Sequence, residues 1–289
     1  MSFPLSFQQR RLWLIDAMEP ESGVYVVASA WRITGPLKIG ALESAVEALV
    51  ERHASLRTTF ALRNGEPVQI VTDHGNLTLR IVDLADWSPA ERETECRHII
   101  DDVTGRGFDL AVGPLFRPVL IRLAPEDHVL VFARHHIIND ARSNEIYSRD
   151  LNLLYRAFAN GEPCELEPLS LQYGDYAVRQ HERLAGDVLA RDLSYWRGYL
   201  EGAPSFLDLP TDHPRTPAQT FRGARERRVL DPTLADAVVT FARKHRCTPF
   251  MVLLAAYNAL LHRYTGAEDL VVGTPIANRD AGEADEIIG

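Results

Sequence analysis

Two adjacent histidines and a following aspartate have the residue types that an acyl-transfer site needs. His135 and His136 close the apolar run "VFARHH", and Asp140 comes four residues after the second histidine. An imidazole titrates near neutral pH, so it can accept a proton from an attacking group. A carboxylate at this spacing can pair with an arginine and hold the intervening loop in shape. The three residues therefore suggest a base and its structural support.

The adjacency of the two histidines bears on which of them could do chemistry. Successive side chains of a strand point to opposite faces, so one imidazole can be packed while the other faces a cleft. A single buried histidine is more often structural, satisfied by a main-chain partner. A metal site is disfavoured, because side chains on opposite faces cannot easily share one ion and no third imidazole or thiolate lies nearby in sequence.

The apolar periodicity predicts the elements that position these residues. The histidines end the second arm of a hairpin at 115–123 and 128–136, and a helix follows at 143–161. The pattern also predicts strands at 24–33, 77–84 and 269–279, a hairpin at 58–71 around Asn64-Gly65, and helices at 39–53, 88–104, 175–201, 231–245 and 248–266.

The last third of the chain has a different character. Residues 204–223 contain several prolines and read as an extended crossing loop. The helix at 248–266 is apolar nearly all round, which predicts that it is buried. The elements after 223 include too few strands to close a sheet of typical width. The sequence is therefore expected to be the front part of a longer domain.

Composition sets the broad class. The 289 residues are 46% hydrophobic and 25% charged, which suits a globular protein of two domains. The net charge is −9 without a basic run, which argues against nucleic acid as a partner. There is no apolar window of membrane-spanning length, so no membrane partner is expected. Three widely spaced cysteines indicate neither a disulfide framework nor a zinc site, and we expect a reduced, cytoplasmic protein.

Five stretches in order carry a resemblance to one family. "HHIINDARS" resembles the HHxxxDG motif of the condensation domains of non-ribosomal peptide synthetases and of their relative chloramphenicol acetyltransferase. The other four are "SFQQRRLW" (6–13), "RHASLRTTF" (52–60), "YGDYAV" (173–178) and "LDLPTDHPRTPAQTFRG" (207–223). The first two look more like domains that join an L-configured donor to an L-acceptor than like those that take a D-donor.

The resemblance implies a mixed α/β fold in which helices and sheets form an α+β sandwich. Two chloramphenicol-acetyltransferase-like lobes would form a V-shaped pseudodimer with a tunnel between them, the second lobe being incomplete in this chain. The expected divisions are an N-terminal lobe at 1–165, a linker and crossing segment at 166–223, and the start of the C-terminal lobe at 224–289.

The resemblance also implies an activity and its partners. An upstream donor and a downstream acceptor peptidyl carrier protein would each deliver a substrate as a phosphopantetheine thioester, so the domain itself would bind no cofactor. An adenylation domain would lie in the same polypeptide. His136 would act on the acceptor amine, as a base or by orienting it. His135, Asp140 and Arg57 would support the site, with Arg57 pairing to Asp140.

The sequence departs from the family pattern after Asp140. Ala141 replaces a glycine, which matters only if φ there is positive, and Arg142 replaces a tryptophan. With Ser143 these residues would lie on the acceptor side of the tunnel. We hypothesise that Arg142 influences the acceptor preference and the rate. Two other interpretations stay open: a non-catalytic condensation-like domain that recruits other enzymes, and a free-standing acyltransferase acting on a small molecule.

Overall fold

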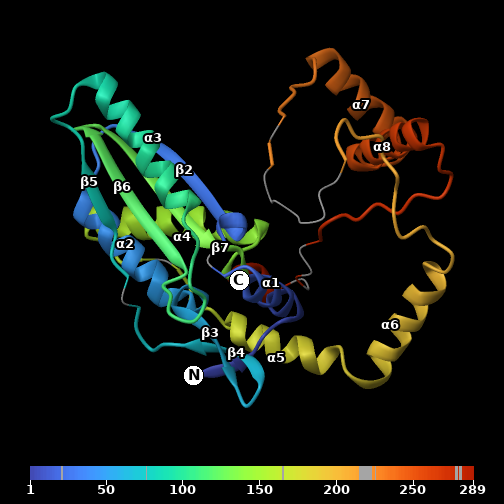
Figure 1. The fold of residues 1–289 in the computed structure, drawn as a ribbon. Helices are drawn as coiled ribbons and strands as arrows, with labels where there is room; N and C mark the ends of the chain where they lie inside the picture. Colours follow the sequence, from blue (N-terminus) through green and yellow to red (C-terminus); the bar gives the residue numbers. More distant parts are fainter. Residues whose placement is uncertain are drawn as a thin grey trace. The chain divides into compact units, whose positions relative to one another are not determined.

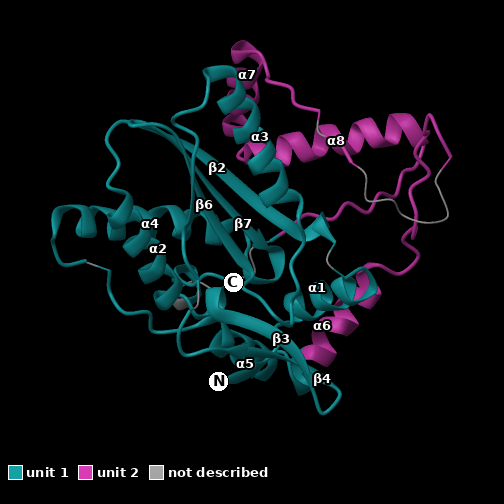
Figure 2. Cartoon of the chain, turned by 60° about the vertical axis from the view of Figure 1, so that its left-hand side comes forward, with its two compact units in different colours: residues 1–188, 276–289 teal, residues 189–275 magenta. Residues whose placement is uncertain are grey.

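The chain folds into two compact units in the computed structural model, which describes every residue except 21, 76, 165, 215–222, 225, 277–278 and 280–281 (Figures 1 and 2). The first unit comprises 1–188 and 276–289, and the second comprises 189–275. The expected N-terminal lobe lies wholly in the first unit, whereas the expected start of the second lobe is divided between the units. The lobe boundaries stay a prediction.

The helices and strands are, in chain order, β1 (Ser2–Pro4), α1 (Phe7–Met18), η1 (Gly23–Tyr25), β2 (Val26–Thr34), α2 (Ile39–Arg52), η2 (Ala54–Arg57), β3 (Thr58–Arg63), β4 (Glu66–Val71), β5 (Arg80–Asp83), α3 (Pro89–Gly105), β6 (Phe116–Ala124), β7 (Asp127–His135), η3 (His136–Ile138), α4 (Ala141–Asn160), α5 (Tyr173–Arg183), α6 (Gly186–Tyr199), α7 (Pro232–Lys244), α8 (Pro249–Thr265) and η4 (Glu283–Glu286). The symbol η marks a 3₁₀ helix. The mixed α/β fold class expected from the sequence is confirmed.

A four-stranded sheet in the order β2-β7-β6-β5 forms the centre of the first unit (Figure 1). β7 pairs antiparallel with both β2 and β6, and β5 adds to β6 in parallel. β6 and β7 are buried along nearly their whole length. Strands buried on both faces need helices on both sides of the sheet.

The alternation of side chains along β6 shows how the two faces are covered. Phe116 packs against Tyr147 of α4 on one face. Its neighbour Arg117 donates to the carbonyl of Val103 in α3, on the other face. α2 packs beside α4 through a stripe of buried residues, which matches its sequence pattern. That stripe consists of Leu42, Ala45, Val46, Leu49 and Val50.

A smaller sheet, β1-β4-β3, lies beside the first helix. The predicted hairpin of β3 and β4 is confirmed, and it turns through Asn64 at φ 53° and Gly65 at φ 82°. Two positive φ values are what a tight two-residue hairpin turn requires. α1 begins with a capping box in which Ser6 and Gln9 exchange side-chain and main-chain hydrogen bonds.

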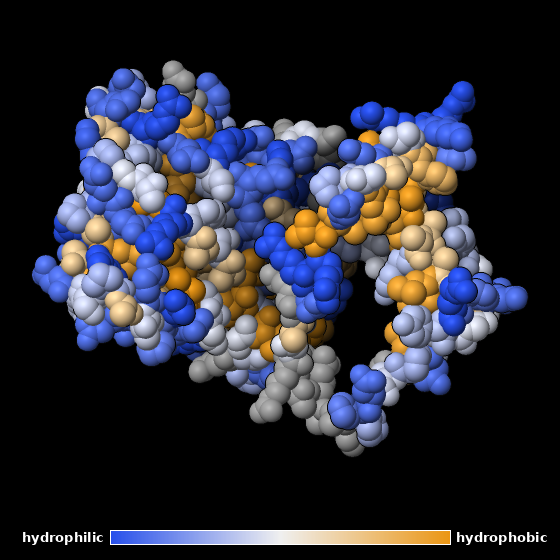
Figure 3. All heavy atoms as spheres, turned by 90° about the horizontal axis from the view of Figure 1, so that it is seen from above, coloured by the Kyte–Doolittle hydropathy of each residue, from blue (hydrophilic) through white to orange (hydrophobic). Residues whose placement is uncertain are grey.

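The second unit departs from two predictions. The strand predicted at 269–279 begins in this unit, and its described residues, 269–276 and 279, form no strand, so that part of the prediction is wrong. The sequence predicts a buried α8, but Leu261 is its only buried residue and side chains such as Phe250 and Tyr264 are exposed. The described part of the unit offers α8 no sheet to pack on, and Figure 3 shows apolar side chains gathered on its surface. Residues 215–222 of the predicted crossing loop lie outside the described residues.

None of the described helices combines the length and apolar character that a membrane crossing requires.

Candidate active site

The end of β7 separates the two histidines, as strand alternation predicts. His135 is the last residue of the strand and is fully buried, while His136 opens the 3₁₀ turn η3 and is exposed. The main-chain N–H of His135 still donates to Leu115 O at 3.0 Å, which fixes the strand end. One imidazole therefore belongs to the core and the other faces outward.

The imidazole of His135 is buried and bonded to the main chain. Its Nδ1 accepts the N–H of Ile137 at 3.1 Å, so in the neutral ring the proton is on Nε2. Burial, and then the neighbouring His136, lower the pKa of His135 to about 4. The ring is therefore neutral at pH 7, and its Nε2 lies 3.8 Å from a carboxylate oxygen of Asp16 without forming an ion pair. Its contribution is to hold the turn that follows.

His136 is the free imidazole of the motif. No side chain among the described residues forms a hydrogen bond or ion pair with its ring. The residues that follow it in the turn, Ile137 and Ile138, are buried. The turn is thus anchored by its apolar side chains while the imidazole remains exposed.

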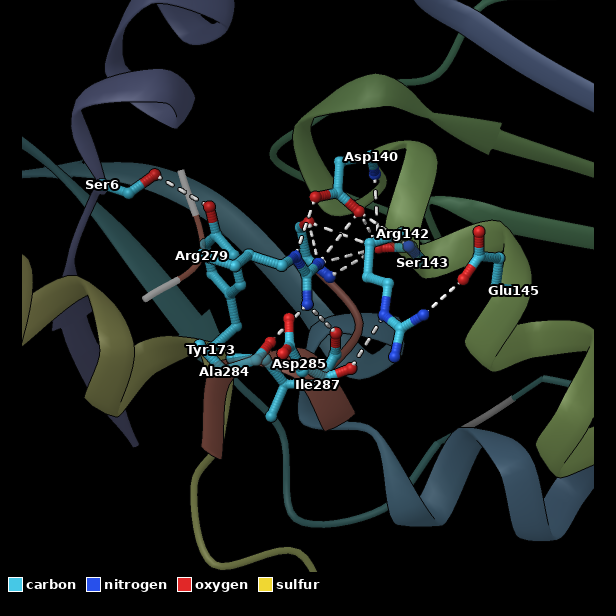
Figure 4. A network of polar contacts seen from close by, with 11 residues as sticks. Ser6, Asp140, Arg142, Ser143, Glu145, Tyr173, Arg279, Ala284, Asp285 and Ile287 are labelled. Atoms are coloured by element: carbon cyan, nitrogen blue, oxygen red, sulfur yellow. Dashed lines mark hydrogen bonds and ion pairs between the residues drawn. The ribbon is translucent and has the colours of Figure 1, made fainter. Parts of the chain in front are cut away.

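Asp140 caps and braces the start of α4 (Figure 4). Its Oδ1 accepts the N–H of Ser143 at 2.7 Å and the hydroxyl of Ser143 at 2.6 Å. Arg279 donates to both carboxylate oxygens, each at 2.9 Å. This bidentate pair is the strong form of a charge-assisted hydrogen bond. Both oxygens of the Asp140 carboxylate therefore have partners within the protein.

The predicted pairing of Arg57 with Asp140 is wrong. The Arg57 guanidinium instead donates to the main-chain carbonyls of Val50, Glu51, Thr72 and Asp73. Val50 and Glu51 lie in the last turn of α2, where carbonyls lack a partner within the helix. Arg57, which ends η2 just beyond that helix, satisfies them and ties the helix end to the loop after β4.

Arg279 holds the C-terminal segment as well as Asp140. Besides the carboxylate, it donates to the carbonyls of Ala284 at 2.6 Å and Ile287 at 2.5 Å. No sequence signal marks this residue, because it lies 139 positions from Asp140 and is one of many arginines.

Ala141 and Arg142 occupy the first turn of α4. The non-glycine residues with positive φ among those described are Asn64 and Arg246, so the backbone at Ala141 does not require glycine. Arg142 donates from Nε to the carbonyl of Asp285 at 3.2 Å, and its Nη1 pairs with Glu145 (Figure 4). Ser143 is buried and also accepts the N–H of Gly289 at 3.1 Å.

Two further groups that sequence reasoning missed fix α4 in place. Buried Asp150 accepts from His53 Nε2 at 2.9 Å, Arg52 Nε at 3.0 Å and Arg149 Nε at 2.8 Å. Burial alone would raise the pKa of Asp150, but the bonds from His53 and Arg149 bring it below its usual value. The cluster joins α4 to the end of α2.

The other group is Arg134, which is fully buried in β7. Its Nη2 donates to Ser29 Oγ at 2.9 Å and to Asn144 Oδ1 at 2.8 Å, and its guanidinium lies 4.7 Å from the ring centre of Tyr147. Burial lowers the pKa of Arg134. These contacts join the first two turns of α4 to β7, the strand that ends at His135.

The described residues hold no group of three histidine, cysteine, aspartate or glutamate side chains placed to bind a metal ion. The motif itself gives no such group, because one of its imidazoles is buried and the other is exposed.

Comparison with known sequences decides the family. A sequence model described as "Condensation domain" matches residues 2–289. The chain belongs to the condensation-domain family. The resemblance stated from the motifs is thereby confirmed.

The related sequences are peptide synthetases much longer than this condensation-domain chain. One of the linear gramicidin synthase subunits of Brevibacillus parabrevis is 41% identical over 286 residues, which are 99% of this chain and 6% of that protein. Phosphinothricin tripeptide synthetase PhsC of Streptomyces viridochromogenes is 40% identical over 99% of this chain and 26% of its own length.

Solved structures share the fold of this condensation-domain chain. SgcC5 of Streptomyces globisporus superposes with a TM-score of 0.79 at 32% identity, over 99% of this chain and 66% of its own. The first condensation domain of the CDA synthetase gives 0.80 at 22% identity, over 100% and 68%. The X-domain from teicoplanin biosynthesis gives 0.83 at 28% identity, over 99% and 63%. The chain thus spans about two thirds of each of these structures.

Proposed function

We propose that the chain forms a peptide bond between a carrier-bound donor thioester and the α-amine of a carrier-bound acceptor, within a non-ribosomal peptide synthetase. The observation that carries this proposal is the exposed His136 imidazole on an anchored turn, beside His135 and Asp140, which are committed to internal bonds. Family membership and the synthetase relatives support it.

The chemistry assigns His136 a role during attack. The acceptor amine nitrogen bonds to the thioester carbonyl carbon, the carbon–sulfur bond breaks, and the phosphopantetheine thiol leaves. The amine loses one proton, which the imidazole can take and pass to the departing sulfur. Since an α-amine has a pKa of about 8, part of it is already neutral at cellular pH. Orienting the amine and removing its proton during attack therefore matter more than generating the nucleophile.

The substrates would be delivered by other domains in the cytoplasm. An upstream and a downstream carrier would each bring a phosphopantetheine arm, and an adenylation domain would load the acceptor carrier. The motifs at 6–13 and 52–60 support an L-configured donor.

Arg142 is proposed to influence the acceptor. It is a cation in the first turn of α4, four residues from Ile138 of the histidine turn, and the family has a tryptophan there. Its bond to Asp285 O holds the side chain toward the C-terminal segment. If the Arg142→Gly variant retains the rate and acceptor preference of the wild type, this role is wrong. Glu145→Gln is the control, because it removes the ion-pair partner of Arg142 and leaves the arginine.

A condensation assay by intact-protein mass spectrometry tests the proposed function. The full polypeptide in which the chain occurs receives a donor-loaded carrier and an aminoacyl-loaded acceptor carrier. Wild type is compared with His136→Ala and with a control variant, His98→Ala, whose side chain is 70% exposed on α3. Product in wild type and in the control, with a loss of at least about 100-fold in His136→Ala, is the expected result.

Two other outcomes point elsewhere. Product at an undiminished rate in His136→Ala would reduce the histidine to part of a scaffold. No product from wild type with several acceptors would favour recruitment of another protein. That second candidate has an observation in its favour, since the teicoplanin X-domain, which has this fold at 28% identity, has been solved in complex with OxyB.

A further inference from the structure

The side chain of Gln9 reaches from α1 to the histidine turn. Gln9 lies in the first turn of α1 and is 2% exposed. Its Nε2 donates to the carbonyl of Ile137 at 3.3 Å and to Oε1 of Gln69 at 3.2 Å. Its Oε1 accepts the N–H of Ser6 at 3.0 Å. Both amide protons and the amide oxygen of this buried group are therefore used.

The amide is held by its own surroundings. The N–H of Gln9 donates to Ser6 Oγ at 3.1 Å, which completes the capping box. Gln69 is buried in β4 and donates from its own Nε2 to Pro4 O at 2.8 Å. The donor that meets Ile137 is thus part of a network joining α1, β1 and β4.

The peptide groups on either side of Ile137 are held by two buried side chains. His135 Nδ1 accepts its N–H at 3.1 Å, and Gln9 Nε2 donates to its carbonyl. His136 immediately precedes Ile137 and is the exposed residue of this turn. The direction of the His136 side chain depends on the dihedral angles of the turn, so groups that fix Ile137 also fix the imidazole.

We propose that Gln9 is a positioning residue for His136: its buried amide, together with His135, holds the histidine turn in the geometry in which the imidazole meets the substrates. The inference rests on the proposed function for its kinetic consequence. Gln9 acts through the main chain and does not touch the reacting atoms. A displacement of about 1 Å in a catalytic group can reduce a rate by about 100-fold.

Gln9→Glu is a selective test, because it spares the helix. A glutamate at this position of a capping box still accepts the N–H of Ser6, and a negative charge suits a helix N-terminus. It places a carboxylate oxygen opposite the carbonyl of Ile137 where an N–H was. Gln9→Met removes the donor without adding charge. Gln8→Glu is the matched control, because exposed Gln8 uses its Oε1 to accept from Gln180, which a carboxylate also does.

The experiment measures kcat and KM for both carrier-bound substrates in the full polypeptide, well below the Tm of each variant. The expected result is a 10- to 100-fold lower kcat in both Gln9 variants with KM changed less than about twofold, and wild-type values in Gln8→Glu. A lower Tm with an unchanged kcat would overturn the proposal, because a purely structural role changes only stability.

A second measurement does not depend on activity. Diethyl pyrocarbonate labels exposed imidazoles, and peptide mass spectrometry gives the labelling rate at His136 with His98 as internal reference. We expect the His136 rate to change more than twofold in both Gln9 variants and not in Gln8→Glu. An unchanged rate would overturn the positioning role. If wild type makes no peptide bond, the proposed function fails, and the labelling result still decides whether Gln9 holds the turn.

Discussion

Replacing Arg279 by methionine tests whether the brace on Asp140 stabilises the start of α4. The Arg279 side chain is 6% exposed, and its donors reach both oxygens of Asp140 and the carbonyls of Ala284 and Ile287. Methionine keeps much of the length and packing and removes every donor. The substitution therefore leaves a carboxylate without its cation.

The magnitude follows from how much of the pair is buried. Removing one partner of a fully buried ion pair costs about 3–5 kcal/mol. The Asp140 side chain is 29% exposed and keeps two bonds from Ser143, so water and the helix cap compensate part of that loss. We expect the free energy of unfolding to fall by about 2–3 kcal/mol. For a domain of this size the Tm then falls by about 4–12 °C.

Thermal and urea unfolding of wild type and variant measure this change. Arg10→Gln is the control, because the Arg10–Glu66 pair spans 3.6 Å with both side chains more than half exposed. Pairs of that kind contribute at most about 1 kcal/mol. A double variant, Asp140→Asn with Arg279→Met, keeps an N-cap side chain and should recover at least about 1 kcal/mol of the loss. The reasoning is refuted if Arg279→Met shifts the Tm no more than Arg10→Gln.

Three more predictions concern buried or capping groups. Asp150→Asn should lower the free energy of unfolding by about 2–3 kcal/mol, because the fully buried carboxylate pairs with Arg52 and Arg149, whose side chains are 14% and 38% exposed and partly reach water. Asp192→Asn, in an exposed pair, should leave the Tm within experimental error. Ala141→Gly should cost no more than about 1 kcal/mol in urea unfolding and leave the peptide-bond rate within twofold, because φ at this position is not positive. The pKa of His135 falls from 6.5 when unfolded to about 4 when folded, so the unfolded chain binds more protons between these values. Stability should therefore be complete above pH 6.5 and decrease by about 3 kcal/mol as the pH drops to 4. In His135→Asn the side-chain oxygen can still accept the main-chain N–H of Ile137. This variant should reduce the pH dependence of stability by about one proton, and His74→Asn should not.

The local elements of the first unit could be predicted from the sequence because neighbouring residues encode them. The apolar stripe of α2 predicted its five buried positions, and Asn64-Gly65 predicted the hairpin turn. The alternation at the end of β7 separated a buried His135 from an exposed His136. Each of these features depends on residues within a few positions of one another.

Prediction failed where a partner lies far along the chain. Arg57 was expected to meet Asp140, but it satisfies nearby helix carbonyls, and Arg279 arrives from the other end of the chain. α8 is apolar nearly all round and yet exposed, because burial depends on what packs against a helix as well as on its own sequence.

The sequence by itself determined many elements of the first unit, the family motifs and the pair of histidines, since periodicity, turn residues and motif spacing are local properties. Only the tertiary structure decided which side chains contact the histidine turn and Asp140. The bond from Gln9 to Ile137 and the pairing of Asp140 with Arg279 each join residues more than 120 positions apart. No local pattern records such contacts, because they exist only once the strands and helices have packed.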